Sequence, residues 1–293
     1  MEFSGSYVAL VTPWTKDLSG IDYGALKDLI DWHVESGTDG ILPAGTTGES
    51  ATLSHREQEE LIVKTVEMVN GRCKVLAGAG SNNTAESVSL AKHAKKAGAD
   101  SILVITPYYN RPTQEGLVRH FGTVAENCDL PTMIYNVPVR TGTNILPETV
   151  ARINRDFPNV SAVKEASGSV DQSSQIINMT DMDVLSGDDP LTLPIMAVGG
   201  KGVVSVIANI APGETKQLTA AAMAGDYAKA REWHHKLLPI MKACFVETNP
   251  GPVKTALRMM GRIDSRMRLP MVEPRPESEK IILDALRKVG LVQ

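Results

Sequence analysis

Residues 159–168 of this chain have the sequence NVSAVKEASG. β-Branched and small residues, closed by Gly168, are typical of a strand that is buried on both faces of a parallel sheet. Lys164 interrupts this apolar run, and desolvation of a buried ammonium lowers the pKa of a lysine. A neutral amine attacks carbonyl carbon, so the segment points to Schiff-base chemistry. The alternative is an ordinary lysine at a strand end that reaches solvent or pairs with Glu165.

Seven further segments resemble Val160–Lys164, and amphipathic helical segments separate them along the chain. The other predicted strands are Tyr7–Thr12, Gly40–Pro43, Lys74–Ala79, Ser101–Thr106, Thr132–Asn136, Asp183–Ser186 and Gly202–Val206. Most are continuous apolar runs, as expected for parallel strands covered by helices. Eight strand–helix units predict an α/β fold, a (β/α)₈ TIM barrel. The rival is a doubly wound open sheet, which usually has fewer strands, and no G-x-G-x-x-G follows the first strand here.

Helix start signals support the alternation of strands and helices. Ser54 with Glu57, Ser169 with Gln172 and Asn83 with Glu86 all have the spacing of a capping box. The pattern changes after about residue 225, where three helices follow one another without strands. They are predicted at Tyr227–Ala243, Val253–Gly261 and Glu277–Val289. We therefore predict a catalytic barrel domain at residues 1–224 and a C-terminal helical domain at residues 225–293.

Composition restricts the possible partners. The 293 residues carry a formal net charge of −4 and no long block of like charge, so nucleic acid and anionic membranes are not expected to bind. No segment approaches the ~18 apolar residues of a membrane span. The N-terminus has no secretory signal pattern, and three scattered cysteines do not suggest a disulfide framework. A cytoplasmic location is expected.

In a TIM barrel the reactive groups lie at the C-terminal ends of the strands. Polar residues gather at those ends here, in Gly45–Ser50, Thr106–Asn110, Tyr135–Pro138 and Ser186–Asp189, and Lys164 ends its own strand. This clustering favours a catalytic role for Lys164 over the ordinary alternative.

Residue chemistry suggests a role for each group. Lys164 would attack a keto carbon, and the phenol of Tyr135 would shuttle the proton that a carbinolamine needs in order to lose water. Thr47 could relay that proton, and the backbone N–H groups of Thr46 and Thr47 suit a carboxylate. Arg140 offers a planar fork for a second carboxylate. Alternatively, Tyr135 only hydrogen-bonds in the core, the threonines only shape a turn, and Arg140 forms a surface ion pair.

Metal and cofactor sites are not predicted. Asp188 and Asp189 are adjacent carboxylates, yet no ligand cluster accompanies them, and the six histidines are scattered. The glycine-rich run Gly199–Gly202 precedes the last strand, so a turn is favoured over a phosphate loop. His33 lies on the apolar face of the first helix and is expected to be a packed, hydrogen-bonded histidine.

At these residues the sequence resembles the pyruvate-dependent, Schiff-base-forming class I aldolases, the family of the dihydrodipicolinate synthases and N-acetylneuraminate lyase. The resemblance covers nearly the whole chain. It is carried by Gly45-Thr46-Thr47-Gly48-Glu49, Pro107-Tyr108-Tyr109-Asn110, Tyr135-Asn136-Val137-Pro138 and Lys164 with its apolar flanks.

The resemblance implies that Lys164 forms an imine with pyruvate and that Tyr135 is the proton shuttle. It implies that Thr47 links Tyr135 to Tyr109, which enters the site from the neighbouring subunit of a dimer. Arg140 would bind the carboxylate of the incoming L-aspartate-4-semialdehyde. Gly187 and the backbone carbonyl of Val204 would line the pocket.

Arg140-Thr141-Gly142 and Thr46-Thr47 favour the synthase branch, which acts in the lysine and diaminopimelate pathway. The lyase branch typically has Ser-Thr in place of Thr46-Thr47 and a residue other than arginine in place of Arg140. An aldolase for 2-keto-3-deoxy sugar acids or N-acetylneuraminate is the alternative. A keto-acid sensor without turnover is disfavoured, because Lys164, Tyr135, Thr47 and Tyr109 are all present.

The family's regulated members bind L-lysine at the dimer interface, and the resemblance extends to that site. The matching residues are Ser50, Ala51, His55, Asn82, Glu86 and Tyr108. Gln58 departs from the histidine or glutamate that is common there, so weak or absent feedback is expected. The resemblance also implies a homotetramer built as a dimer of dimers.

Overall fold

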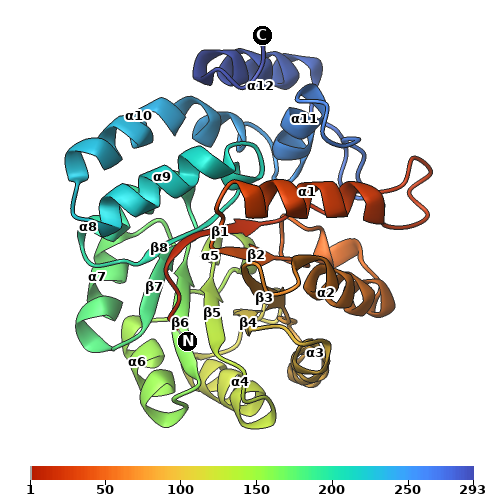
Figure 1. Ribbon diagram of the computed structural model, residues 1–293. Coiled ribbons are helices and arrows are strands. Elements are labelled where there is room, and N and C mark those ends of the chain that lie inside the picture. Colours follow the sequence, from red (N-terminus) through yellow and green to blue (C-terminus); the bar gives the residue numbers. More distant parts are fainter. Residues whose placement is uncertain (1) are drawn as a thin grey trace.

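A closed barrel of eight parallel strands forms the centre of the molecule (Figure 1). The computed structural model describes residues 2–293. Each strand pairs with the next one along the chain, and β8 closes the ring by pairing with β1. The strands are β1 Gly5–Ala9, β2 Gly40–Leu42, β3 Lys74–Gly78, β4 Ser101–Ile105, β5 Thr132–Asn136, β6 Val160–Glu165, β7 Asp183–Ser186 and β8 Gly202–Ser205. The predicted TIM barrel is confirmed, and the open doubly wound sheet is wrong.

All eight predicted strands exist, and β1 differs most from its prediction. It ends at Ala9, although the apolar run continues to Val11. Beyond the strand, the Val11 amide donates to Asn209 Oδ1 at 3.0 Å and the Thr12 hydroxyl donates to the Gly48 carbonyl at 2.6 Å. These residues are buried under loops at the end of the barrel, so an apolar pattern alone could not distinguish them from strand residues.

Helices surround the barrel (Figure 1). They are α1 Tyr23–Glu35, α2 His55–Val69, α3 Thr84–Ala97, α4 Gln114–Asn127, α5 Pro138–Thr141, α6 Pro147–Asp156, α7 Val170–Met179, α8 Thr192–Ala197, α9 Pro212–Met223, α10 Tyr227–Ala243, α11 Gly251–Met259 and α12 Pro276–Val289, with short 3₁₀ turns η1 Ser50–Thr52, η2 Asp189–Leu191 and η3 Ile207–Asn209.

Local capping chemistry begins these helices where the sequence indicates. Ser54 and Glu57 form the predicted capping box of α2. Asn83 caps α3, but Glu86 accepts a hydrogen bond from the Ser81 hydroxyl instead of completing a box. His33 is fully buried in α1, with Nδ1 3.2 Å from the Thr38 hydroxyl, so the prediction of a packed histidine is confirmed.

Two apolar layers form the core of the protein. A large outer layer lies between the strands and helices, and a smaller inner cluster fills the interior of the ring. The inner cluster includes Phe3, Tyr7, Leu42, Leu76, Leu103, Met133, Leu185 and Val204. Because these side chains close the interior, a substrate can approach only at the end of the barrel where Lys164 and Tyr135 lie.

The last three helices lie together along one side of the ring (Figure 1). Helix α10 packs against α9 and α12, and α11 packs against α12 and η3. The prediction of consecutive helices without strands is therefore correct, while the division into domains at residue 225 stays a prediction. None of the helices within residues 2–293 has the length and apolar character needed to cross a bilayer.

Candidate active site

Lys164 and Tyr135 face each other across neighbouring strands. They are register partners in the β5–β6 pair, and Lys164 Nζ lies 4.2 Å from the centroid of the Tyr135 ring. Lys164 is only 5% exposed. Burial lowers the pKa of Lys164 to about 7; the carboxylate of Asp189 opposes this shift and the guanidinium of Arg140 adds to it. A large fraction of the amine is therefore neutral at pH 7.

Glu165 does not pair with Lys164, so that alternative is wrong. Successive side chains of a strand point to opposite faces, which separates the two residues. The buried Glu165 carboxylate accepts hydrogen bonds from Asn136 Nδ2 at 3.1 Å, from Gln172 Nε2 at 3.1 Å and from the Ser167 amide at 2.6 Å. These bonds join the ends of β5 and β6 directly behind the Lys164–Tyr135 pair.

The loop after β7 lies against the lysine. A Cβ atom at Gly187 would lie 3.0 Å from Lys164 Cε and 2.8 Å from Ala166 Cβ, so a larger residue would displace the lysine. Asp189 is buried and accepts hydrogen bonds from Ser205 Oγ at 2.5 Å and from the amide of Val206 at 3.0 Å. Burial raises the pKa of Asp189 to about 6, although these donors oppose the shift.

The two threonines after β2 have different contacts. Thr46 contacts the phenol of Tyr135: burial raises the pKa of Tyr135, while Arg140 and then the Thr46 hydroxyl oppose the rise. Thr47 is 3% exposed, and its hydroxyl accepts a hydrogen bond from Asn249 Nδ2 at 3.0 Å. Both threonines line the cavity together with Tyr135, and the link from Thr47 to Tyr135 stays a prediction.

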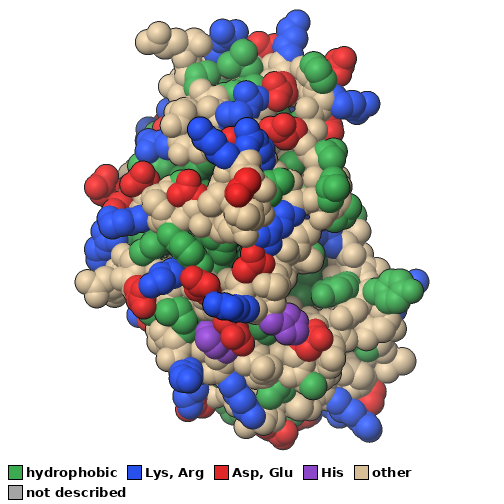
Figure 2. All heavy atoms as spheres, turned by 90° about the vertical axis from the view of Figure 1, so that its right-hand side faces the viewer, with side chains coloured by type: hydrophobic (Ala, Val, Ile, Leu, Met, Phe, Trp, Pro, Cys, Tyr) green, Lys and Arg blue, Asp and Glu red, His purple; other side chains and the backbone are tan. Residues whose placement is uncertain are grey.

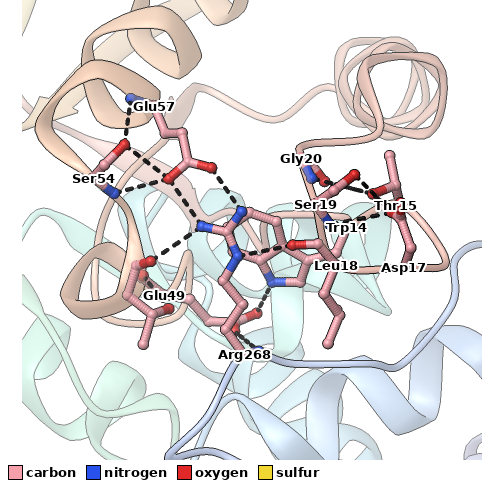
Figure 3. A network of polar contacts seen from close by, with 11 residues as sticks. Trp14, Thr15, Asp17, Leu18, Ser19, Gly20, Glu49, Ser54, Glu57 and Arg268 are labelled. Atoms are coloured by element: carbon pink, nitrogen blue, oxygen red, sulfur yellow. Dashed lines mark hydrogen bonds and ion pairs between the residues drawn. The ribbon is translucent and has the colours of Figure 1, made fainter.

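A polar network fixes the loop that carries these threonines (Figure 3). Glu49 has a left-handed backbone, with φ 57°, and its carboxylate accepts from Trp14 Nε1 at 3.0 Å and from Lys254 Nζ at 2.7 Å. Arg268 stacks on the Trp14 ring at 3.9 Å and donates to both carboxylate oxygens of Glu57. Two side chains of the C-terminal segment, Lys254 and Arg268, thereby bind this region at Glu49 and at Glu57.

Arg140 enters the site from α5. Its Nη2 donates to the backbone carbonyl of Asn249 at 3.3 Å, and it has no acidic partner among residues 2–293, in contrast to the surface ion pair considered as an alternative. A cavity of about 890 Å³ opens between the strand ends and the C-terminal segment. Its lining includes Thr46, Thr47, Tyr135, Arg140, Lys164, Gly187, Asp188 and Asn249. Val204 is buried in the inner cluster beneath it.

Tyr109 lies apart from this cavity. Its side chain is 91% exposed, and its backbone has φ 70°, a strained value for a tyrosine. Tyr109 is absent from the lining of the cavity within its own chain. This position is compatible with a contribution to a neighbouring subunit and offers nothing to the site of the same chain.

A second cavity of about 350 Å³ adjoins the first, and the two share Thr46, Tyr135 and Arg140. Of the residues predicted for lysine binding, the structure places Ser50, Ala51, His55, Gln58, Glu86 and Tyr108 in its lining. Asn82 is not in the lining. Its backbone carbonyl accepts a hydrogen bond from Asn110 Nδ2 at 2.8 Å. Gln58 is buried and donates to the Gly78 carbonyl at 3.0 Å.

Within residues 2–293, no three histidine, cysteine or acidic side chains are placed to hold a metal ion. Acidic and basic side chains are intermingled over the face drawn in Figure 2, which shows no large patch of one sign.

Sequence reasoning missed Asn249 and Lys254. Asn249 lies more than 100 residues from Arg140 and 202 from Thr47, and nothing in its local sequence indicates a site. Lys254 is a fully buried lysine of α11 that pairs with Glu49, and the only available sign was its position on the apolar side of a short helix.

The family model for the dihydrodipicolinate synthetase family matches residues 2–288. A 4-hydroxy-tetrahydrodipicolinate synthase of Methanocaldococcus jannaschii is 51% identical over 290 residues, which cover 99% of this chain and 100% of that one. A crystal structure of dihydrodipicolinate synthase from Aquifex aeolicus superposes with a TM-score of 0.97 at 48% identity, covering 99% of both chains.

Two other solved structures concern ligands and assembly. One is the synthase from Cyanidioschyzon merolae with lysine bound, with a TM-score of 0.96 and 39% identity over 100% of both chains. The other is a monomeric dihydrodipicolinate synthase variant, with a TM-score of 0.96 and 42% identity over 99% of this chain and 98% of that one.

Proposed function

Because the chain belongs to the dihydrodipicolinate synthetase family, we propose how its site performs the reaction of a 4-hydroxy-tetrahydrodipicolinate synthase. That enzyme is a lyase of the class I aldolase type, and it condenses pyruvate with L-aspartate-4-semialdehyde at the committed step of lysine and diaminopimelate synthesis. One observation carries the assignment of roles: Lys164 is a desolvated amine beside the Tyr135 phenol, in a cavity that Arg140 also lines.

Lys164 Nζ attacks the keto carbon of pyruvate and forms a carbinolamine. Tyr135 delivers the proton with which the former carbonyl oxygen leaves as water, and an imine remains. Loss of a proton from the methyl group gives an enamine, whose carbon adds to the aldehyde carbon of the second substrate. Water or the substrate amine then releases the product from Lys164, and the product cyclises.

Carboxylates bind at two ends of the cavity. The backbone N–H groups around Thr46 and Thr47 receive the carboxylate of pyruvate, next to the phenol that Thr46 contacts. Arg140 receives the carboxylate of the aldehyde, because it is a guanidinium that lines the cavity without an acidic partner within residues 2–293. Gly187 leaves room for the imine. Val204 lies in the inner apolar cluster and outside the lining of the cavity, so the role of its backbone carbonyl stays a prediction.

Tyr109 completes the proton relay from a neighbouring subunit, through Thr47. Its exposed side chain and strained backbone support this role, because a single chain gives it no partner in the cavity. The assembly proposed is a homotetramer made of two such dimers. The cytoplasmic location stays a prediction.

L-lysine is the proposed effector, and its site is the second cavity. The support is the position of Ser50, His55 and Glu86 in its lining, together with the shared residues Tyr135 and Arg140 that connect it to the active site. The side-chain amide of Gln58 donates to the Gly78 carbonyl, so this N–H group is already paired within the chain. This pairing supports weak feedback inhibition by L-lysine.

The roles are tested by incubating the protein with pyruvate and borohydride, locating the adduct by mass, and then assaying with L-aspartate-4-semialdehyde. We expect a reduced pyruvate adduct on Lys164 and turnover of the semialdehyde. An adduct without turnover would indicate a sensor, and turnover with 2-keto-3-deoxy sugar acids alone would indicate the aldolase alternative. An adduct on another lysine would refute the role of Lys164.

A further inference from the structure

Asn249 presents a hydrogen-bond acceptor without a donor. The residue is 5% exposed, and its Oδ1 atom is buried without a partner among residues 2–293. The same residue lines the 890 Å³ cavity that contains Lys164 and Arg140. An unpaired buried amide oxygen costs ~1–3 kcal/mol, so its retention in a substrate cavity suggests that a ligand supplies the donor.

Two other contacts hold Asn249 between the groups that bind substrate. Its Nδ2 donates to Thr47 Oγ1 at 3.0 Å, and its backbone carbonyl accepts from Arg140 Nη2 at 3.3 Å. The Thr47 bond fixes the amide group, and the Arg140 bond places the guanidinium next to the same residue. The free oxygen therefore belongs to a side chain that is already ordered before a ligand binds.

We propose that Asn249 Oδ1 accepts a hydrogen bond from the α-ammonium of the aldehyde substrate, and so selects an amino-acid semialdehyde over the same aldehyde without an amine. The inference rests on the function proposed above. An amide oxygen only accepts hydrogen bonds, so its partner must be a donor. In L-aspartate-4-semialdehyde the ammonium and the carboxylate share one carbon atom. A carboxylate held by Arg140 thus brings the ammonium close to residue 249.

The charge of the surroundings agrees with this orientation. Asp188 lines the same cavity, is partly buried, and has no ion-pair partner within residues 2–293. A carboxylate in the lining of the cavity favours a bound cation over a second anion. The aldehyde substrate then binds as a zwitterion, with its carboxylate on Arg140 and its ammonium toward Asn249.

The test compares two aldehydes on the same variants. L-aspartate-4-semialdehyde carries the ammonium, and succinic semialdehyde is the same chain without it. For N249L we expect the KM of the first to rise about 10- to 100-fold, the loss typical of a hydrogen bond to a charged group. The inhibition constant of succinic semialdehyde should change by less than about threefold, since it has no donor to lose. N249D keeps an acceptor and should retain the discrimination.

The comparison separates binding from structure. N249L also removes the bond to Thr47, but that loss affects both aldehydes equally, and pyruvate trapping by borohydride reports whether the fold and Lys164 are intact. Equal changes for the two aldehydes in N249L, or no change for either, would overturn the proposal. So would a selective loss in D188N without one in N249L. If N249L does not fold, N249S gives the same comparison.

A failure of the proposed function would be detected by a different measurement from a failure of the Asn249 proposal. It would appear in the unmodified protein, as absent turnover of L-aspartate-4-semialdehyde, before any Asn249 variant is considered. Failure of the Asn249 proposal appears only in the variants, while the unmodified protein remains active.

Discussion

At the scale of single residues, the site depends on one amine whose pKa is lowered by burial. Lys164 lies between strand residues and Gly187, and the carboxylate of the buried Asp189 opposes the lowering of its pKa. An exposed lysine has a pKa near 10.4 and would be almost wholly protonated at pH 7. Burial of Lys164 thus increases the fraction of neutral, nucleophilic amine at pH 7.

The pH dependence of imine formation follows from this pKa. Lys164 loses its proton with a pKa of about 7, so the reactive fraction is large above pH 7 and falls about tenfold per pH unit below it. The initial rate of trapping by pyruvate and cyanoborohydride, measured from pH 5 to 9, should rise with a midpoint near 7 and then level off. A rate that keeps rising above pH 9 would show an ordinary solvated lysine.

Arg140 is expected to act chiefly on the second substrate. R140A removes the guanidinium that lines the cavity, so the KM of L-aspartate-4-semialdehyde should rise about 100-fold, as for loss of a charge-assisted pair. Borohydride trapping of pyruvate on Lys164 should persist, because burial is the main cause of the lowered pKa of Lys164 and Arg140 only adds to it. R140K is the matched variant, and it should recover only part of the affinity because an ammonium lacks the planar fork. Loss of pyruvate trapping in R140A would contradict this role.

At the scale of elements, the ends of β5 and β6 are joined by a buried carboxylate and two amides. Glu165 satisfies the side-chain amides of Asn136 and Gln172, while Tyr135 and Lys164 occupy the opposite face of the same two strands. The alignment of Lys164 with Tyr135 thus depends on hydrogen bonds of Glu165 that lie outside the substrate cavity.

Removing this carboxylate should cost stability as well as activity. E165L leaves the Ser167 amide without its acceptor and removes one of the acceptors of Asn136 Nδ2 and of Gln172 Nε2, which both still donate to Asn144 Oδ1. The loss should lower the free energy of unfolding by about 3 kcal/mol. E165Q keeps one acceptor oxygen and should lose less. Urea unfolding followed by circular dichroism measures both variants. An unchanged midpoint in E165L would show that the strand ends do not depend on these bonds.

The sequence predicted the elements well because each depends on local chemistry. Strands such as Thr132–Asn136 and helices such as Tyr227–Ala243 were placed correctly from apolar runs and capping residues. The site was predicted where strand ends carry polar residues, as at Lys164 and Tyr135. Asn249 and Lys254 were not, since their partners lie some 200 residues earlier in the chain and only folding brings them together.

At the scale of the whole molecule, the C-terminal helices stabilise the loop that carries Thr46 and Thr47. Lys254 of α11 is fully buried; it donates to Glu49 at 2.7 Å and to the carbonyls of Thr12 and Arg266 at 3.0 and 2.7 Å. Burial lowers the pKa of Lys254, and the adjacent Glu49 carboxylate opposes that shift. One ammonium thus joins the loop after β1, the loop after β2 and the segment before α12.

Loss of this ammonium should therefore weaken the barrel and the site together. K254M leaves Glu49 as a buried charge without its cation, which typically costs about 3–5 kcal/mol of unfolding free energy. The double variant E49Q/K254M removes both charges and keeps an acceptor for Trp14 Nε1, so it should regain part of that stability. Because the same loop carries Thr47, kcat should fall in K254M while pyruvate trapping on Lys164 persists. Thermal unfolding of the three proteins measures the coupling, and a double variant no more stable than K254M would show that the buried pair is not what joins the C-terminal helices to the active-site loop.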